Sequence, residues 1–287
     1  MLVGLDHIVV GVKDMSQALE TFQRLGFFVY PGGEHPGRGT HNAVVLFDAD
    51  YLGLIAPLDT KLEGGRGLAA SLEAQGEGIR TFVVGSNALA DDMRFIRSRG
   101  VEIADIEERD RRTPEGLLLQ WRAANPGPAN PFPLYFIQHE TPVEQRRAQV
   151  PKAAPHPNGV MGLRGIAVVV EHLAEATARY HQMLGISPGP PHASIALGGL
   201  ATVFNFETTQ VILVEPGNRS GPAREALSDR GVGPFLMLLR SRAASATLGY
   251  LQEHRIPVYS QARLPNGPRY VITGPEAAHG AWIQWIE

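Results

Sequence analysis

Three histidines near the amino end of the chain are the residues whose type and spacing could do chemistry. His7 lies in the apolar run LDHIVVGV, and His35 and His41 lie in EHPGRGTHN, where Glu34 could add a carboxylate. Three imidazoles suit zinc when they converge on one ion. Alternatively, His7 is a hydrogen-bonded core or pocket histidine, and the other two hydrogen-bond the loop backbone. The chain has no cysteine, which excludes a thiolate ligand or nucleophile.

A unit of one strand, one helix and three further strands would position these histidines. The first run is typical of a strand, and alternation along it places Leu5, His7 and Val9 on one face. A helix of apolar spacing follows, with Asp14 as its N-cap. The further strands are expected at 27–30, 42–47 and 51–56.

The same order of elements recurs three more times, so the sequence predicts four modules. They are expected at about 4–57, 78–140, 163–216 and 233–287. The segment 141–162 is rich in proline and lacks periodicity, which is typical of an extended linker. We therefore expect two domains, at 1–140 and 163–287.

Composition limits the classes of partner. An apolar content of 44% and a charged content of 19% are those of a folded globular protein. A net charge of −3 gives no electrostatic reason to expect nucleic acid or an anionic membrane. The opening residues lack the basic region of a signal peptide. We expect a cytoplasmic monomer or homodimer that binds a small-molecule ligand and neither nucleic acid nor membrane.

Several segments together resemble a known superfamily. LDHIVVGVKD, HPGRGTHNAVV, YLGLIAP, RRTPEGLLLQW and NPFPLYFIQHE are similar to the glyoxalase-like branch of the vicinal-oxygen-chelate (glyoxalase/bleomycin resistance/dioxygenase) superfamily. The resemblance covers roughly 3–140, and over 160–287 only the rhythm of elements persists. It implies an α+β fold of two tandem domains, in which four βαβββ modules form open curved sheets. It also implies a divalent metal on the concave face, held by the first and last strands of each module.

Most positions that the resemblance assigns to metal ligands carry other residue types. His7 matches the first-strand histidine, but the carboxylate position of that module falls on Gly53. In the second module the two positions fall on Thr81 and Tyr135. The corresponding residues of the second domain are Gly165, Ile212, Leu236 and Gln284. We therefore expect no metal in the usual arrangement, and no cofactor.

Without a metal, the polar residues of the concave face predict a ligand pocket. Buried polar groups are costly unless a partner, water or ligand satisfies them. His7, His41, Thr81 and Tyr135 would line this pocket, and His7 or His41 could act as a catalytic general base near neutral pH.

The hairpin of the second module offers two further candidates. Arg112 could pair with an anion and Trp121 could form a stacking wall. Alternatively, Trp121 packs in the core and Arg112 is solvated. The charged run IEERDRR at 106–112 is interpreted as a solvated strand end or loop.

These observations favour a small-molecule-binding, glyoxalase-like protein with its pocket in the N-terminal domain and a degenerate metal site. The second domain would be structural and pack against the first. The alternative is a metal-dependent lyase, isomerase or dioxygenase of the superfamily that acts on a small organic substrate. In that case His7, His35 and His41 would hold Zn, Fe, Mn or Ni. The sequence leaves open whether the protein is an enzyme.

Overall fold

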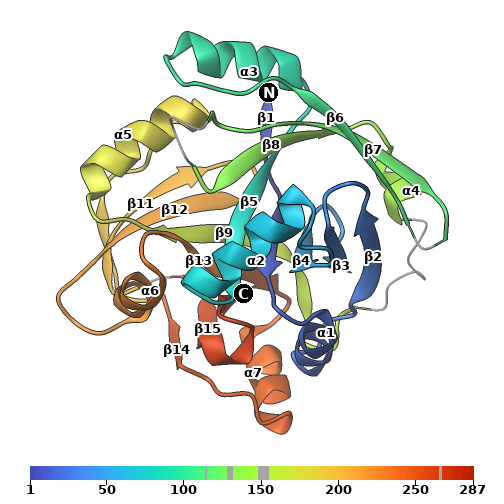
Figure 1. Cartoon of the computed structure of the whole chain (residues 1–287). Coiled ribbons are helices and arrows are strands. Elements are labelled where there is room, and N and C mark those ends of the chain that lie inside the picture. Colours follow the sequence, from blue (N-terminus) through green and yellow to red (C-terminus); the bar gives the residue numbers. More distant parts are fainter. Residues whose placement is uncertain (114, 128–131, 148–154, 265–266) are drawn as a thin grey trace.

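The chain folds into two eight-stranded sheets with helices packed on them (Figure 1). The structure is a computed structural model. The residues that it describes are 1–113, 115–127, 132–147, 155–264 and 267–287. The order of one strand, one helix and three strands occurs four times, so the predicted α+β fold with four modules is confirmed.

Two modules form the first sheet, and their first strands meet at its centre. β1 pairs antiparallel with β5, and each also pairs parallel with the last strand of its own module, β4 or β8. The strand order is β2-β3-β4-β1-β5-β8-β7-β6. The bounds are β1 (Leu2–Gly11), β2 (Tyr30–His35), β3 (Thr40–Leu46), β4 (Tyr51–Pro57), β5 (Gly78–Ser86), β6 (Glu107–Arg112), β7 (Leu118–Ala124) and β8 (Leu134–His139).

The second sheet repeats this topology. Its central strands β9 and β13 are antiparallel, and the order is β10-β11-β12-β9-β13-β16-β15-β14. The bounds are β9 (Val160–Val169), β10 (His192–Ser194), β11 (Gly199–Asn205), β12 (Gln210–Pro216), β13 (Gly233–Ser241), β14 (Ser260–Arg263), β15 (Arg269–Thr273) and β16 (Trp282–Ile286). The resulting pseudo-symmetry relates the two sheets as well as the two modules within each sheet.

One helix follows the first strand of each module. These helices are α1 (Met15–Arg24), α3 (Leu89–Ser98), α5 (Leu173–Leu184) and α7 (Ala244–Glu253). Asp14 caps α1 as expected, because its Oδ1 accepts from the amides of Ser16 and Gln17 at 2.8 and 3.1 Å. Two helices that join modules, α2 (Glu63–Gln75) and α6 (Pro222–Arg230), were not expected from the sequence. In the described part of the chain, no helix is long and apolar enough to cross a membrane.

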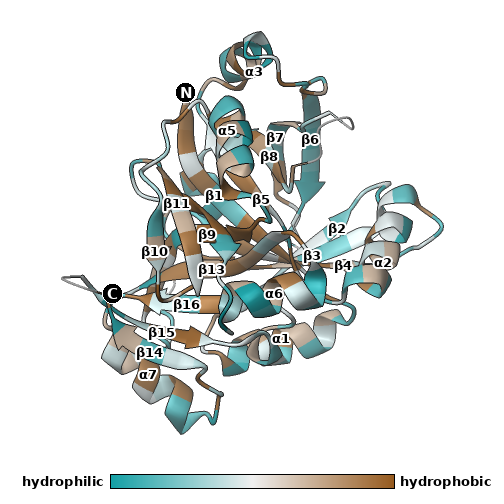
Figure 2. Ribbon diagram, turned by 90° about the vertical axis from the view of Figure 1, so that its left-hand side faces the viewer, coloured by the Kyte–Doolittle hydropathy of each residue, from teal (hydrophilic) through white to brown (hydrophobic). Residues whose placement is uncertain are grey.

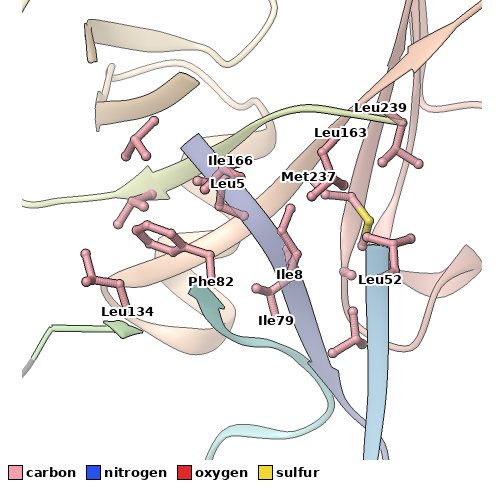
Figure 3. Close-up of a cluster of buried hydrophobic side chains, with 14 of the residues drawn as sticks. Leu5, Ile8, Leu52, Ile79, Phe82, Leu134, Leu163, Ile166, Met237 and Leu239 are labelled. Atoms are coloured by element: carbon pink, nitrogen blue, oxygen red, sulfur yellow. The ribbon is translucent and has the colours of Figure 1, made fainter. Parts of the chain in front are cut away.

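A single hydrophobic core joins the two domains. Leu5, Ile8 and Phe82 of the first sheet belong to the same buried cluster as Ile166 and Met237 of the second (Figure 3). β1 lies against β9, and β5 lies against β13. The hydropathy colouring agrees, since β13 is largely hydrophobic whereas the edge strand β2 is mainly hydrophilic (Figure 2). One face of each sheet is thus buried against the helices that follow the first strands and against the other domain, and the opposite face of each is left for other contacts.

The segment expected to be an extended linker is partly helical and packed. It contains α4 (Val143–Arg147), and 148–154 lies outside the described residues. His156 and Asn158 are buried. The amide of Phe28 donates to Nδ1 of His156 at 3.1 Å, and Nδ2 of Asn158 donates to the carbonyl of Leu25 at 2.9 Å. These bonds fix the end of the segment to the first domain.

Candidate ligand-binding site

A cavity of about 350 Å³ lies on the face of the first sheet opposite the shared core. Its volume is within the range of small-molecule sites. Every strand of the sheet contributes to its wall, by His7, Tyr30, Asn42, Gly53, Thr81, Arg111, Trp121 and Tyr135. The structure thus brings together four residues that the sequence proposed for the pocket: His7, Thr81, Trp121 and Tyr135. His35 also lines the cavity.

Two other proposed residues lie outside the wall, each next to a residue that lines it. His41 is not among the lining residues, whereas its neighbour Asn42 is. Arg112 is exposed and donates to the carbonyl of Gly116 at 3.3 Å, whereas Arg111 lines the cavity. Because side chains alternate along a strand, an error of one position moves a residue to the other face.

The charged run at 106–112 is largely solvated as expected, but it is neither a strand end nor a loop, because residues 107–112 form the edge strand β6. Charged side chains are a normal way to protect an edge strand from pairing with another chain. The alternation of β6 turns Arg111 towards the cavity and leaves Arg112 in solvent. The strand therefore positions a cation in the wall.

A bulge in β1 sets the position of the site. Opposite β5, Leu5 pairs with Val84 and His7 pairs with Val83, so one extra residue, Asp6, is inserted in β1. Leu5 consequently belongs to the shared core and His7 to the cavity wall. The expectation that Leu5 and His7 share a face is wrong for this reason. Bulges re-aim side chains in this way beside functional sites.

Asp6 and two histidines form a largely buried network beside the cavity. Oδ1 of Asp6 lies 2.6 Å from Nδ1 of His7, and its Oδ2 lies 2.9 Å from Nε2 of His139. A carboxylate can only accept, so the proton of the His7 ring is assigned to Nδ1. Nε2 of His7 is then an acceptor, and the Oη of Tyr135 lies 3.4 Å from it. Neither Asp6, which directly precedes His7, nor His139 was selected from the sequence.

Two members of the network, Asp6 and His7, have a defined charge state at neutral pH. Burial raises the pKa of Asp6, but the hydrogen bonds of His139 and His7 outweigh it, and the pKa is held well below its usual range. Burial lowers the pKa of His7, although the Asp6 carboxylate opposes this change. Asp6 is therefore ionised and His7 is neutral at pH 7.

Two tyrosines enclose the His7 ring. The ring of Tyr51 stacks on it with centroids 4.2 Å apart, and the ring of Tyr135 meets it edge-on at 6.1 Å. Burial raises the pKa of Tyr135 to about 12, and burial and the Asp6 charge raise that of Tyr51 further above its usual value. Both phenols stay protonated at neutral pH and can donate hydrogen bonds.

The residues of the cavity do not fit a divalent metal. Three of the four positions implied by the resemblance are Gly53, Thr81 and Tyr135, and Oγ1 of Thr81 donates to the carbonyl of Pro133 at 2.9 Å. His35 is bonded to Oγ1 of Thr40 at 2.8 Å. Within the described residues, no three His, Asp or Glu side chains are grouped so that they could hold an ion. The three-histidine set that the sequence allowed is not assembled.

The corresponding face of the second sheet is filled by its own side chains. Ile212 and Leu236, at two of the ligand positions, belong to a buried apolar cluster that also contains Trp282 and residues of α6. Gln284 is buried as well. The second domain therefore presents apolar packing where the first presents polar groups.

A larger cavity of about 710 Å³ lies between α2 and β5 of the first domain and α5 and α6 of the second. Its wall mixes charges of both signs, including Glu171, Glu175 and Arg230. It contains neither the Asp6 network nor any of the four positions named above. The smaller cavity is therefore the better candidate for the functional site.

Comparisons with solved structures show the same fold. A hypothetical protein from Staphylococcus aureus aligns with a TM-score of 0.67 and 12% identity over 99% of this chain and 98% of that one. A mutant of 4-hydroxymandelate synthase from Streptomyces coelicolor aligns with the same score and identity over 99% and 92%. A xylose isomerase-like TIM barrel/4-hydroxyphenylpyruvate dioxygenase fusion protein aligns with a TM-score of 0.62 and 12% identity over 100% of this chain and 48% of that one. At such identities the likeness concerns the fold alone.

Sequence comparison identifies the family. No curated protein gives a significant match. The glyoxalase-like domain family matches residues 5–188, which is more than half of the chain and includes all of the cavity-bearing sheet except the first three residues of β1. The chain belongs to the glyoxalase-like domain family.

Proposed function

We propose that the first domain binds a small organic molecule with a carboxylate group, without the help of a divalent metal. The observation that carries this proposal is Arg111. Its guanidinium lines the cavity and donates to the carbonyl of Gly32, but no carboxylate of the described residues pairs with it. Burial lowers its pKa, which reports the cost of holding the charge there. A ligand carboxylate would offset that cost through charge-assisted hydrogen bonds.

The acidic side chains near Arg111 do not serve as its partner. Asp6 is engaged by two imidazoles. Glu115 also lines the cavity, but it is exposed and forms no ion pair with Arg111 in the described structure. Burial, and in addition the charge of Arg111, lower the pKa of His35 to about 4. The His35 ring is therefore neutral at pH 7 and adds no competing charge.

The remaining wall indicates the body of the ligand. Aromatic and aliphatic side chains dominate it, including Tyr30, Val44, Leu119, Trp121 and Ile137. Apolar surface of this kind favours an apolar or aromatic group, and the few polar residues would fix its orientation. An arylalkyl carboxylate such as phenylacetate combines the two features.

The test is binding of phenylacetate and of its neutral analogue phenylacetamide, measured by calorimetry on metal-free protein. Arg111→Met is compared with Arg112→Met, an exposed neighbour on the same strand. We expect wild type and Arg112→Met to bind the acid and to prefer it over the amide. Arg111→Met should lose about 10-fold or more in affinity, because a charge-assisted hydrogen bond contributes about 1.5–3 kcal/mol.

Equal binding of acid and amide, or equal affinity of the two variants, would contradict the role of Arg111. Failure of a wider series of arylalkyl acids to bind would contradict the proposed function itself. A cytoplasmic location and a monomeric or dimeric state stay predictions from the sequence.

A further inference from the structure

We infer that His7 is the general base of a proton-transfer reaction on the bound anion, with Asp6 and His139 as positioning residues. This inference rests on the proposed function, since it needs an anion held in the same cavity. It adds an activity and a substrate class, namely oxo acids with an acidic C–H bond.

The hydrogen bonds of His7 differ from those of a structural histidine in this chain. Both ring nitrogens of His156 are engaged, by the amide of Phe28 at 3.1 Å and the carbonyl of Leu46 at 3.2 Å. His7 is held firmly at Nδ1 only. Among the described residues, the one polar contact of its Nε2 is with Oη of Tyr135 at 3.4 Å, beyond the usual hydrogen-bond range, and His7 lines the cavity. Nε2 is thus an available lone pair in the ligand space.

The carboxylate of Asp6 is placed to support proton uptake at Nε2 of His7. Its carboxylate fixes the ring and the tautomer, and it would stabilise the imidazolium that forms when Nε2 takes a proton. His139 holds the second oxygen of Asp6 and so fixes the carboxylate. A buried carboxylate is costly, and the chain places this one by inserting an extra residue in its first strand. Packing alone does not require such an arrangement.

The chemistry of these groups selects the substrate. A neutral imidazole is a weak base and removes a proton from carbon only when an adjacent electron-withdrawing group acidifies the C–H bond, and in an oxo acid the carbonyl group does so. The C–H bond breaks, its proton goes to Nε2 of His7, and its electron pair moves through carbon to the carbonyl oxygen, giving an enolate. The protonated phenol of Tyr135 is a nearby donor for that oxygen. Return of the proton from the imidazolium to carbon restores the base, so no oxidant or co-reactant is needed.

The experiment is hydrogen–deuterium exchange in D₂O, followed by proton NMR at C3 of phenylpyruvate and of 2-oxobutyrate. Binding of each acid is measured in parallel by calorimetry. We expect wild-type protein to bind at least one acid and to accelerate its exchange well above the buffer rate. His7→Gln should keep the affinity and lose about 100-fold or more of the acceleration, the usual contribution of a general base.

The positioning residues are tested by whether their substitution changes the maximal exchange rate or the KM. Asp6→Asn and His139→Gln should lower the maximal exchange rate about 10-fold or more with an unchanged KM. His139→Gln keeps the test valid if Asp6→Asn fails to fold, which circular dichroism would reveal. Arg111→Met should act differently and raise KM.

The outcomes separate the two proposals. Binding without accelerated exchange in wild type, or full acceleration in a folded His7→Gln protein, would overturn the inference and leave the proposed function standing. Absence of binding by both acids and by the simple carboxylates would overturn both.

Discussion

The carboxyl group of Asp50 makes the stability of the two-domain structure depend on pH in an unusual direction. Asp50 precedes β4, and its Oδ1 accepts from the amide of Leu163, in β9 of the second domain, at 2.9 Å. Burial raises the pKa of Asp50 from 3.8 to about 7, although this hydrogen bond and the charge of Arg240 act against the rise. In the folded protein the group is therefore mainly protonated below pH 7, whereas in the unfolded chain it ionises near pH 4.

The sign follows from the protons bound by each state. Between about pH 4 and 7 the folded state holds a proton on Asp50 that the unfolded state has lost. The contribution of Asp50 to the free energy of unfolding therefore falls as the pH rises through this range. The difference between 3.8 and about 7 corresponds to about 4 kcal/mol, at ~1.36 kcal/mol per pKa unit. Asp50→Asn keeps an oxygen for the Leu163 amide and cannot ionise.

The assay is urea denaturation of wild type and Asp50→Asn at pH 4 and pH 8, with Asp110→Asn, an exposed residue of β6 that does not act on Asp50, as control. We expect the Asp50 variant to match wild type at pH 4 and to exceed it by up to about 4 kcal/mol in free energy of unfolding at pH 8. The control should match wild type at both. A variant less stable than wild type at pH 8 would show that the attraction between Asp50 and Arg240 dominates, and would refute the reasoning.

Two further substitutions test the shared core and the cavity. Trp285 is fully buried and stacks on Phe27 of the first domain, with ring centroids 5.6 Å apart. Trp285→Ala should therefore lower the free energy of unfolding by about 3–5 kcal/mol. A thermal melt in which the second domain alone loses its transition would contradict a common core. Gly53 lines the cavity, and a Cβ there would have its nearest neighbours at 3.9 Å, so Gly53→Glu should fold normally. Its carboxylate should compete for Arg111 and weaken phenylacetate binding about 10-fold or more, and unchanged affinity in calorimetry would count against the anion site.

The fold was predictable because its signals are local. The run around Ile8, the cap at Asp14 and the repeated order of elements each constrain one module, and four repeats reinforce one another. The joining helices α2 and α6 were missed. Both are weakly amphipathic, and α2 begins with the glycine-rich piece EGGRG, whose composition is not typical of a helix.

The site was predictable only in part, because its register depends on pairing. His7, Thr81 and Tyr135 were found because they occupy the positions on the first and last strands of each module that the resemblance assigns to metal ligands. Asp6 was missed, because regular alternation places it on the face opposite His7, and the bulge that overrides alternation shows only in the pairing with β5. Arg111 was missed by one position for a similar reason, since the residues of β6 could not be assigned to a face before its partner β7 was known.

The most direct test of the account is ligand binding by protein whose metal content is known. Untagged protein purified without chelator would be examined by elemental analysis, together with His7→Ala, and then titrated with phenylacetate before and after dialysis against EDTA. The account predicts binding with the same affinity in both states and no dependence on added zinc, iron, manganese or nickel. Near-stoichiometric metal that is lost in His7→Ala, with binding that disappears when the metal is removed, would contradict it.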